Sequence, residues 1–224
     1  MPTRIHRPSR QPLARELVDA WGGVPTTIAA DLLQGRTLVD PALHALRPFS
    51  GSARLVGPAV TAWCQYADYG AVHHAIAEAQ AGDVIVIAAG GRMDAAMIGE
   101  LLSGAARLKK VAGVVVDGAV RDVGTLVSWP DFPVFARGRT ARGPSSMERG
   151  SVNETVVFGG VPVTPGDLIL GDDDGLVVVP RGEAAARLQA AQAMVRAEEG
   201  WEARLATGAG TVEVFNVPAA EIVP

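Results

Sequence analysis

Residues 90–122 read GGRMDAAMIGELLSGAARLKKVAGVVVDGAVRD, and this stretch decides the fold of the 224-residue chain. Gly99-Glu100-Leu101-Leu102 opens a predicted helix that ends at Lys109-Lys110, where the helix dipole favours positive charge. The run Val114–Val116 is β-branched and lies just after a glycine, which predicts a short buried strand. Arg121-Asp122 follow that strand, so every group capable of chemistry here lies at the end of an element.

The start of the predicted helix and the Arg121-Asp122 pair together suggest a binding site. A helix N-terminus presents unpaired N–H groups and partial positive charge, so residues 99–102 can hold a carboxylate. Asp122 with several waters is a sufficient ligand set for Mg²⁺, because that ion keeps much of its hydration. The residues alone leave two alternatives open. Asp122 can instead cap a helix over residues 123–127, and Arg121 can be an ordinary surface arginine.

The composition excludes several classes of protein. With 48% hydrophobic residues, 20% charged residues and 26 glycines, the chain is typical of one folded α/β or α+β domain. The net charge of −4 and the scattered basic residues argue against nucleic acid as a partner. The single cysteine, Cys64, excludes an internal disulfide and a cysteine-rich zinc site. No apolar run is long enough for a membrane span or a signal peptide, so we expect a cytoplasmic protein.

The rest of the chain alternates between helical and strand patterns after an extended arm at residues 1–10. Apolar spacing predicts helices at about residues 13–21, 28–33 (capped by Thr26 and Thr27), 71–80 and 183–205. Strands are predicted at residues 51–63 (in two segments broken by Gly57-Pro58), 84–87, 132–136, 168–170 and 176–179. Residues 211–215 are expected to add a strand or to reach another subunit. We divide the chain into an arm and helix (1–23), a main domain (24–206) and a tail (207–224).

Four polar features have ordinary structural explanations beside any functional one. Asp31 is expected to be a solvated charge on its helix. His73 and His74 are adjacent and point about 100° apart around a helix, so they do not share one metal easily. The arginine-rich loop over residues 137–150 either collects an anion, faces solvent or contacts a neighbouring subunit. Asp172–Asp174 lack the alternating spacing of a calcium loop and indicate a turn between strands.

Several common catalytic devices are missing from the sequence. There is no phosphate-binding P-loop, no serine nucleophile elbow, no zinc-protease helix motif and no dinucleotide fingerprint. The only lysines, Lys109 and Lys110, lie at a helix end where solvent is expected, which argues against a Schiff-base mechanism. Carboxylate chemistry with a hard metal ion is the option that remains.

Four motifs occur together in this chain: Gly99-Glu100-Leu101-Leu102, VAGVVVDGAVRD at 111–122, PVFARG at 133–138, and PGD at 165–167 with DDDG at 172–175. Over about residues 24–206, this combination resembles the RraA-like and 4-hydroxy-4-methyl-2-oxoglutarate aldolase family. The resemblance implies an α/β fold, an α-β-β-α sandwich of the swivelling phosphohistidine-like type. It also implies a homotrimer or hexamer with sites between subunits.

The resemblance implies two branches of function. One branch consists of class II (metal-dependent) pyruvate aldolases, carbon–carbon lyases that use Mg²⁺ or Mn²⁺ to cleave 4-hydroxy-2-oxo acids and that also decarboxylate oxaloacetate. The other branch binds and inhibits ribonuclease E without catalysis. The aldol chemistry requires an Arg-Asp pair, present here as Arg121-Asp122, so the enzyme is favoured over the regulator. Another metal-dependent 2-oxo acid lyase or hydrolase is a third reading.

Carried over by the resemblance, five groups of residues acquire roles. Asp122 corresponds to the metal-anchoring aspartate, and Arg121 to the arginine that holds substrate and polarises its keto oxygen. The amides of Gly99, Glu100, Leu101 and Leu102 correspond to the carboxylate-binding helix start. Asp31 and Glu198 fall where acids from a neighbouring subunit complete the catalytic set. The segment Tyr66–Gly70 departs from the family's usual aspartate-asparagine pattern, which suggests a different substrate.

Overall fold

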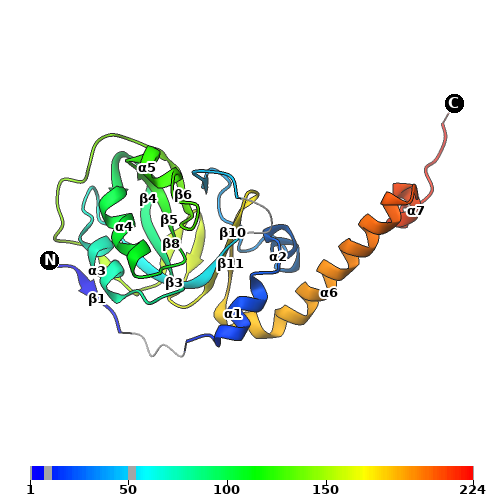
Figure 1. Ribbon diagram of the computed structural model, residues 1–224, viewed down its shortest axis with the longest axis horizontal. Helices are drawn as coiled ribbons and strands as arrows, with labels where there is room; N and C mark the ends of the chain where they lie inside the picture. Colours follow the sequence, from blue (N-terminus) through cyan, green and yellow to red (C-terminus); the bar gives the residue numbers. More distant parts are fainter. Residues whose placement is uncertain (1, 8–11, 50–53, 224) are drawn as a thin grey trace.

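The protein is described by a computed structural model that covers residues 2–7, 12–49 and 54–223. Four parallel strands form the centre of its main sheet, in the order β3 (Leu55–Trp63), β4 (Val84–Ile98), β5 (Gly113–Val120) and β6 (Val134–Arg139). The crossover connections between them carry the helices α3 (Gly70–Glu78), α4 (Glu100–Leu108) and α5 (Val123–Val127). These helices cover one face of the sheet (Figure 1).

Shorter strands extend this sheet and add a second β layer. The edges are formed by β2 (His44–Ala45), β7 (Ser151–Val152) and β1 (Arg4–Ile5), the last of which pairs parallel with β7. The hairpin β10 (Leu168–Asp172) and β11 (Gly175–Val179) joins the sheet through β10 and β3, while β8 (Val156–Phe158) and β9 (Val161–Val163) pair with each other. The arm predicted at residues 1–10 is therefore partly a strand, and residues 1 and 8–10 of that prediction lie outside the described residues.

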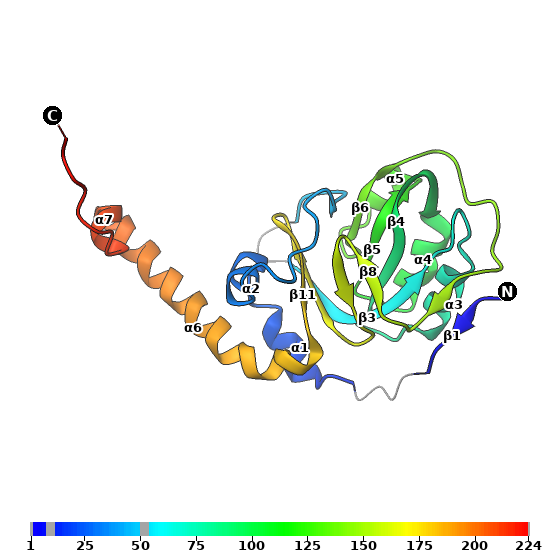
Figure 2. The same cartoon turned by 180° about the vertical axis from the view of Figure 1, so that it is seen from behind.

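The remaining helices lie on the far side of the β10–β11 hairpin. They are α1 (Arg15–Trp21), α2 (Thr26–Leu32) and α6 (Arg181–Ala206), and α7 (Thr211–Val214) follows at the end of α6. Figures 1 and 2 show α6 running away from the body of the molecule, with α7 at its outer end. None of the helices in the described residues combines the length and apolar character needed to cross a bilayer.

Three clusters of buried side chains separate four layers. The first lies between the parallel strands and α3–α5, with Ile85 and Val114 facing Val72. The second joins the other face of the same strands to β8–β11 and contains both Phe135 and Phe158. The third packs the β10–β11 hairpin against α1, α2 and α6. Successive side chains on a strand point to opposite faces, so the apolar strands bury both faces. The α-β-β-α sandwich predicted from the sequence is confirmed.

The structure corrects two predictions about strands. Gly57-Pro58 does not break the strand; β3 runs straight through it and changes its partner there, from β10 to β4. Proline supplies no N–H to a ladder, so a change of partner is a suitable place for it. Residues 51–53 of that predicted strand lie outside the described part of the chain. The strand predicted at residues 84–87 continues to Ile98, with irregular pairing after Ala88.

Thr26 and Thr27 do not cap their helix as predicted. Thr26 is the first residue of α2, and both its N–H and its hydroxyl donate to the carboxylate of Asp172, at 3.0 and 2.5 Å. The helix is thus capped by a residue distant in sequence. Asp172 begins the turn between β10 and β11, as predicted for the aspartate run.

The strand that was one alternative for residues 211–215 is wrong, whereas contact with another subunit stays a prediction. Residues 211–214 form α7, which folds back on α6 so that the rings of Phe215 and Trp201 lie 5.3 Å apart. Arg204 also donates to Glu213 at 3.0 Å. These contacts stabilise a local helical turn at the outer end of α6.

Candidate functional site

The candidate site lies where the parallel strands end. Ile98 at the end of β4 and Val120 at the end of β5 are paired across the sheet, so Gly99 and Arg121 emerge side by side. The N–H of Arg121 donates to the carbonyl of Ile98 at 3.1 Å, which fixes this junction. Ligands in open α/β sheets bind outside the carboxyl ends of the strands. The start of α4, Arg121 and Asp122 thus lie together at this end of the sheet.

Asp122 is bound to the start of a different helix from the one that follows it. It occupies the N-cap position of α5 with a left-handed backbone (φ 56°), but its side chain makes no capping bond to α5. Its Oδ2 instead accepts the N–H of Glu100, the first residue of α4, at 3.0 Å. The Arg121 Nε lies 3.6 Å from the same oxygen. The capping interpretation therefore holds for the position of Asp122 and fails for its carboxylate, which faces the α4 terminus.

Two glycines make room for this pair. A Cβ on Gly99 would lie 2.7 Å from the Arg121 Cγ and would collide with the Asp122 Oδ2. A Cβ on Gly143, in the loop after β6, would lie 2.6 Å from the Arg121 Nη1. Gly99 has an extended backbone (φ −151°), so the lack of a side chain is what the site requires there. Sequence reasoning missed Gly143, because nothing in the local pattern links that loop to Arg121.

The helix start supplies fewer amides than the sequence suggested. Of the first N–H groups of α4, that of Glu100 is already bound to Asp122, and that of Ser103 donates to the carbonyl of Gly99. Within the described residues, the N–H groups of Leu101 and Leu102 have no recorded acceptor. These two amides are available to an anion at the positive end of the α4 dipole.

A cavity of about 140 Å³ opens at this point. Arg121, Asp122 and Gly99 line one side of it. The other lining residues come from α3 and its start, the end of β4, the first turn of α4 and the loop after β6: Tyr69, His73, Ala96, Met97, Ile98, Leu101, Leu102 and Pro144. Each of the four parallel strands thus sends a segment to the cavity. Tyr69 and His73 were not assigned to the site from sequence, because only the crossover of α3 brings them there.

The donor set fits a hydrated, hard metal ion held by one carboxylate. The Oδ1 of Asp122 has no hydrogen-bond partner among the described residues, and its side chain is 42% exposed. No group of three or more His, Cys, Asp or Glu side chains suitable for a metal occurs in the part of the chain that the structure describes. A fully protein-coordinated zinc or calcium site does not match this arrangement, whereas Mg²⁺ is commonly held by one or two carboxylates and waters.

Asp31 and Glu198 lie away from this cavity within one chain. Asp31 is exposed on α2, and Glu198 is partly buried on α6. Both helices belong to the layer beyond β10 and β11 (Figures 1 and 2). The residues that line the cavity come instead from the α3 and α4 region and from the loops after β5 and β6. The structure therefore brings together Arg121, Asp122 and the α4 amides, and leaves the two predicted acids elsewhere.

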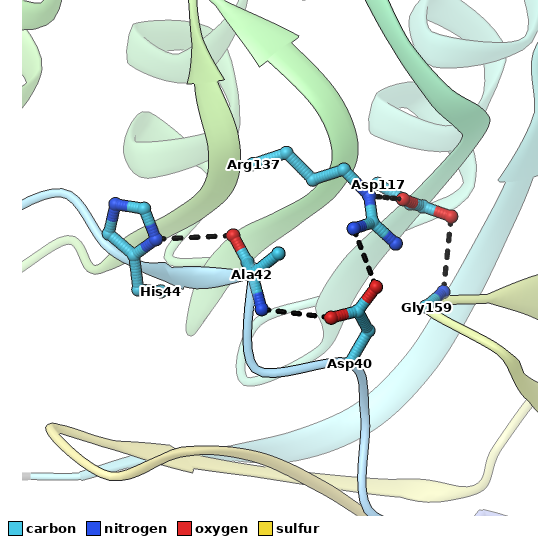
Figure 3. Close-up of polar contacts among 6 residues, drawn as sticks. All are labelled: Asp40, Ala42, His44, Asp117, Arg137 and Gly159. Atoms are coloured by element: carbon cyan, nitrogen blue, oxygen red, sulfur yellow. Dashed lines mark hydrogen bonds and ion pairs between the residues drawn. The ribbon is translucent and has the colours of Figure 1, made fainter.

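Arg137 was predicted to begin the arginine-rich loop, but it lies on β6 and its guanidinium belongs to an internal network (Figure 3). Its Nη1 donates to Asp40 at 2.7 Å and its Nε donates to Asp117, which is only 5% exposed. The second oxygen of Asp117 accepts the N–H of Gly159 at 3.1 Å. The N–H of Ala42 and the guanidinium of Arg137 hold the pKa of Asp40 below its usual value. This network ties β5 and β6 to the second β layer.

Comparison with known proteins agrees with this architecture. Residues 15–178 match the family described as RraA-like, Aldolase/RraA. A protein of Halalkalibacterium halodurans named "Putative 4-hydroxy-4-methyl-2-oxoglutarate aldolase" is 38% identical over 177 residues, which cover 79% of this chain and 82% of that protein.

Two solved structures share the fold. An uncharacterized protein from Pseudomonas syringae has a TM-score of 0.81 and 27% identity, covering 92% of this chain and 99% of that one. Streptomyces coelicolor RraAS2, described as an unusual member of the RNase ES inhibitor RraA protein family, has a TM-score of 0.76 and 30% identity, covering 85% of this chain and 97% of that one. By its family match and its identity to these relatives, the chain belongs to the RraA-like family.

Proposed function

We propose that the chain is a divalent-metal-dependent aldolase that cleaves 4-hydroxy-4-methyl-2-oxoglutarate-type 4-hydroxy-2-oxo acids to pyruvate and also decarboxylates oxaloacetate. The observation that carries this proposal is the Asp122 carboxylate. One of its oxygens is fixed by the Glu100 N–H, the other has no partner among the described residues, and Arg121 lies beside it in the cavity. The similarity to the H. halodurans protein supports the same class of reaction.

In this proposal, different residues of the site bind the metal, bind the substrate carboxylate and stabilise the charge of the transition state. Asp122 would hold Mg²⁺ or Mn²⁺, which when bound supplies a Lewis acid that polarises the 2-oxo group. The N–H groups of Leu101 and Leu102 receive the C1 carboxylate of the substrate. Arg121 places its positive charge where the enolate oxygen develops, in the transition state of either reaction. Cleavage of C3–C4 and loss of CO₂ from oxaloacetate both lead to pyruvate enolate, so one arrangement serves both.

The proposed proton transfers use carboxylates besides Asp122, and no other Asp or Glu is among the described residues that line this cavity. We propose that Asp31 and Glu198 of a neighbouring subunit provide them, in a homotrimer or hexamer with sites between subunits. This assembly accounts for a cavity that carries one acid, Asp122, while two further acids lie on α2 and α6. The oligomeric state of the purified protein, measured by light scattering, tests this part of the proposal. A monomer that is fully active would contradict it.

The test of the reaction is metal-dependent release of pyruvate. Protein treated with a chelator is assayed with oxaloacetate and 4-hydroxy-4-methyl-2-oxoglutarate, before and after addition of Mg²⁺ or Mn²⁺. We expect no pyruvate above the uncatalysed rate until metal is restored. Equal rates with and without metal, or no turnover of any 2-oxo acid in a wider panel that includes other lyase and hydrolase substrates, would refute the proposal.

The alternative is a regulator that binds ribonuclease E without catalysis, which the similarity to S. coelicolor RraAS2 favours. It predicts tight binding to ribonuclease E and slower RNA cleavage. It also predicts that changes at Arg121 leave both effects intact, because that residue would have no part in the interaction.

A further inference from the structure

The cavity has two chemically different walls. Arg121 and Asp122 form the charged one, and their side chains already lie 3.6 Å apart. The other lining residues are mainly aromatic and aliphatic, above all Tyr69, His73 and Leu102. Arg121 is the one side chain with a permanent positive charge among the residues that line the cavity. The cavity therefore matches a substrate with one charged end and one uncharged end.

The aromatic part of this wall is held rigidly. The rings of Tyr69 and His73 lie 4.8 Å apart with an angle of 60° between their planes. The N–H of Tyr69 donates to the carbonyl of Ser146 at 3.0 Å, and its side chain packs against the buried cluster beneath α3. The Tyr69 side chain is thereby held at the start of α3, with the exposed His73 ring against it.

Asp68, immediately before Tyr69, anchors this turn. It is 3% exposed, and its carboxylate accepts the N–H groups of Gly70, Glu148 and Arg149 at 2.9, 3.1 and 3.0 Å. These bonds join the start of α3 to the loop after β6, which also borders the cavity. A buried carboxylate with three backbone donors makes a stiff junction, so the aromatic wall is formed before any substrate binds.

The position of the reacting carbons follows from the proposed function. With the C1 carboxylate and the C2 oxygen of a 2-oxo acid held by the α4 amides and Arg121, the substituent on C4 extends toward the remaining walls. A second carboxylate there would lose water against aliphatic and aromatic side chains without gaining a permanent positive partner. A ring or alkyl group would instead bury apolar surface and stack on Tyr69 or His73.

We propose that Tyr69 and His73 determine substrate specificity, and that the site prefers 4-hydroxy-2-oxo acids with an uncharged aromatic or aliphatic group on C4. This inference rests on the proposed aldolase function. With 4-hydroxy-4-phenyl-2-oxobutanoate, the C4 hydroxyl loses its proton, the C3–C4 bond breaks and its electron pair forms the pyruvate enolate. A proton then adds to C3, so the products are pyruvate and benzaldehyde and no other reactant is consumed.

The test compares kcat/KM for 4-hydroxy-4-phenyl-2-oxobutanoate and 4-hydroxy-4-methyl-2-oxoglutarate, with pyruvate release as the readout. We expect the phenyl substrate to be preferred by about tenfold or more, the range over which apolar pockets discriminate. Tyr69→Asn and His73→Asn should lower this ratio through the KM of the phenyl substrate. The inhibition constant of oxalate, which has no C4 group, reports the pyruvate half of the site separately.

Two matched controls are present in the chain. Tyr66 is 70% exposed and does not line the cavity, and His74 is exposed beside His73 and also does not line it. Tyr66→Asn and His74→Asn should keep the wild-type ratio. Because the His73 side chain is exposed, His73→Asn remains informative even if Tyr69→Asn fails to fold.

The outcomes separate this inference from the proposed function. Pyruvate release with the dicarboxylate preferred, or a ratio unchanged in folded His73→Asn and Tyr69→Asn proteins, would overturn the specificity and leave the aldolase intact. No metal-dependent pyruvate from either substrate or from oxaloacetate would overturn the aldolase itself.

Discussion

Replacing Gly99 with alanine should disable the candidate site without unfolding the protein. The added Cβ would lie 2.7 Å from the Arg121 Cγ and would overlap the Asp122 Oδ2, so both side chains must move. They can move, because they are 43% and 42% exposed and face the cavity. The hydrogen bond from the Glu100 N–H to Asp122 at 3.0 Å is the interaction that is lost.

The size of the effect follows from that bond. A hydrogen bond to a charged group contributes about 1.5–3 kcal/mol. If Asp122 is correctly oriented only while this bond is made, kcat/KM should fall by about 10- to 150-fold, since about 1.4 kcal/mol corresponds to a factor of ten. The free energy of unfolding should change by less than about 1 kcal/mol, because no core contact is removed.

Gly104→Ala is the matched control for this change. Gly104 also lies on α4, but a Cβ there would meet only Trp129, at an ordinary 3.6 Å. This variant should keep full activity and unfold at a slightly higher temperature, because alanine favours the helix by about 0.5–1 kcal/mol. The assay is pyruvate release together with thermal unfolding of both variants. A Gly99→Ala protein with wild-type kcat/KM would refute the account of the site.

Two further predictions concern buried carboxylates. Burial alone would raise the pKa of Asp68. Hydrogen bonds from the Ser146 side chain and from backbone N–H groups together lower it by more, so the pKa lies below its usual value. Its stabilisation is therefore present above about pH 4 and is lost as the pH falls through the lower, folded-state pKa. Urea unfolding between pH 3 and 7 should show a steeper acid loss for wild type than for Asp68→Asn, and equal slopes would contradict this. Arg137→Ala should lower the free energy of unfolding by roughly 3 kcal/mol, because it leaves Asp117 buried without its cation. Arg139→Ala, on the exposed end of the same strand, should change it by less than about 0.5 kcal/mol, and similar losses in the two variants would count against the network.

The sequence predicted what local patterns encode. The β-branched runs and glycine boundaries indicated β5 and the helix α4, and the adjacent position of Arg121 and Asp122 at a strand end followed from them. The layered fold was implied by the family resemblance that the combination of motifs carries. Local patterns also predicted a strand break at Gly57-Pro58, and this prediction is wrong. β10 pairs with β3 up to Pro58 and β4 pairs with it from Ala59, so hydrogen bonding to a neighbouring strand continues through the dipeptide.

The parts that sequence could not predict depend on contacts between distant segments. Asp172 caps α2 from 146 residues away, and Asp122 binds the first amide of α4 from 22 residues away. Neither contact has a local signature, since capping rules describe neighbours in sequence. In the sequence, Tyr69 stood out only because its segment departs from the family pattern, and His73 only as a residue of a predicted helix. The crossover through α3 brings both to the cavity that Arg121 also lines.

The most direct measurement is the rate of pyruvate release from oxaloacetate at increasing Mn²⁺, for wild type, Asp122→Ala and Asp174→Ala. Asp174 is an exposed aspartate in the turn between β10 and β11, and it does not line the cavity. Free Mn²⁺ also promotes this decarboxylation, so the enzyme-free rate at each Mn²⁺ concentration is subtracted. We then expect saturable activation in wild type and in Asp174→Ala, and no activation in Asp122→Ala at any concentration. Wild-type activation in Asp122→Ala would contradict the claim that this carboxylate anchors the metal of a lyase.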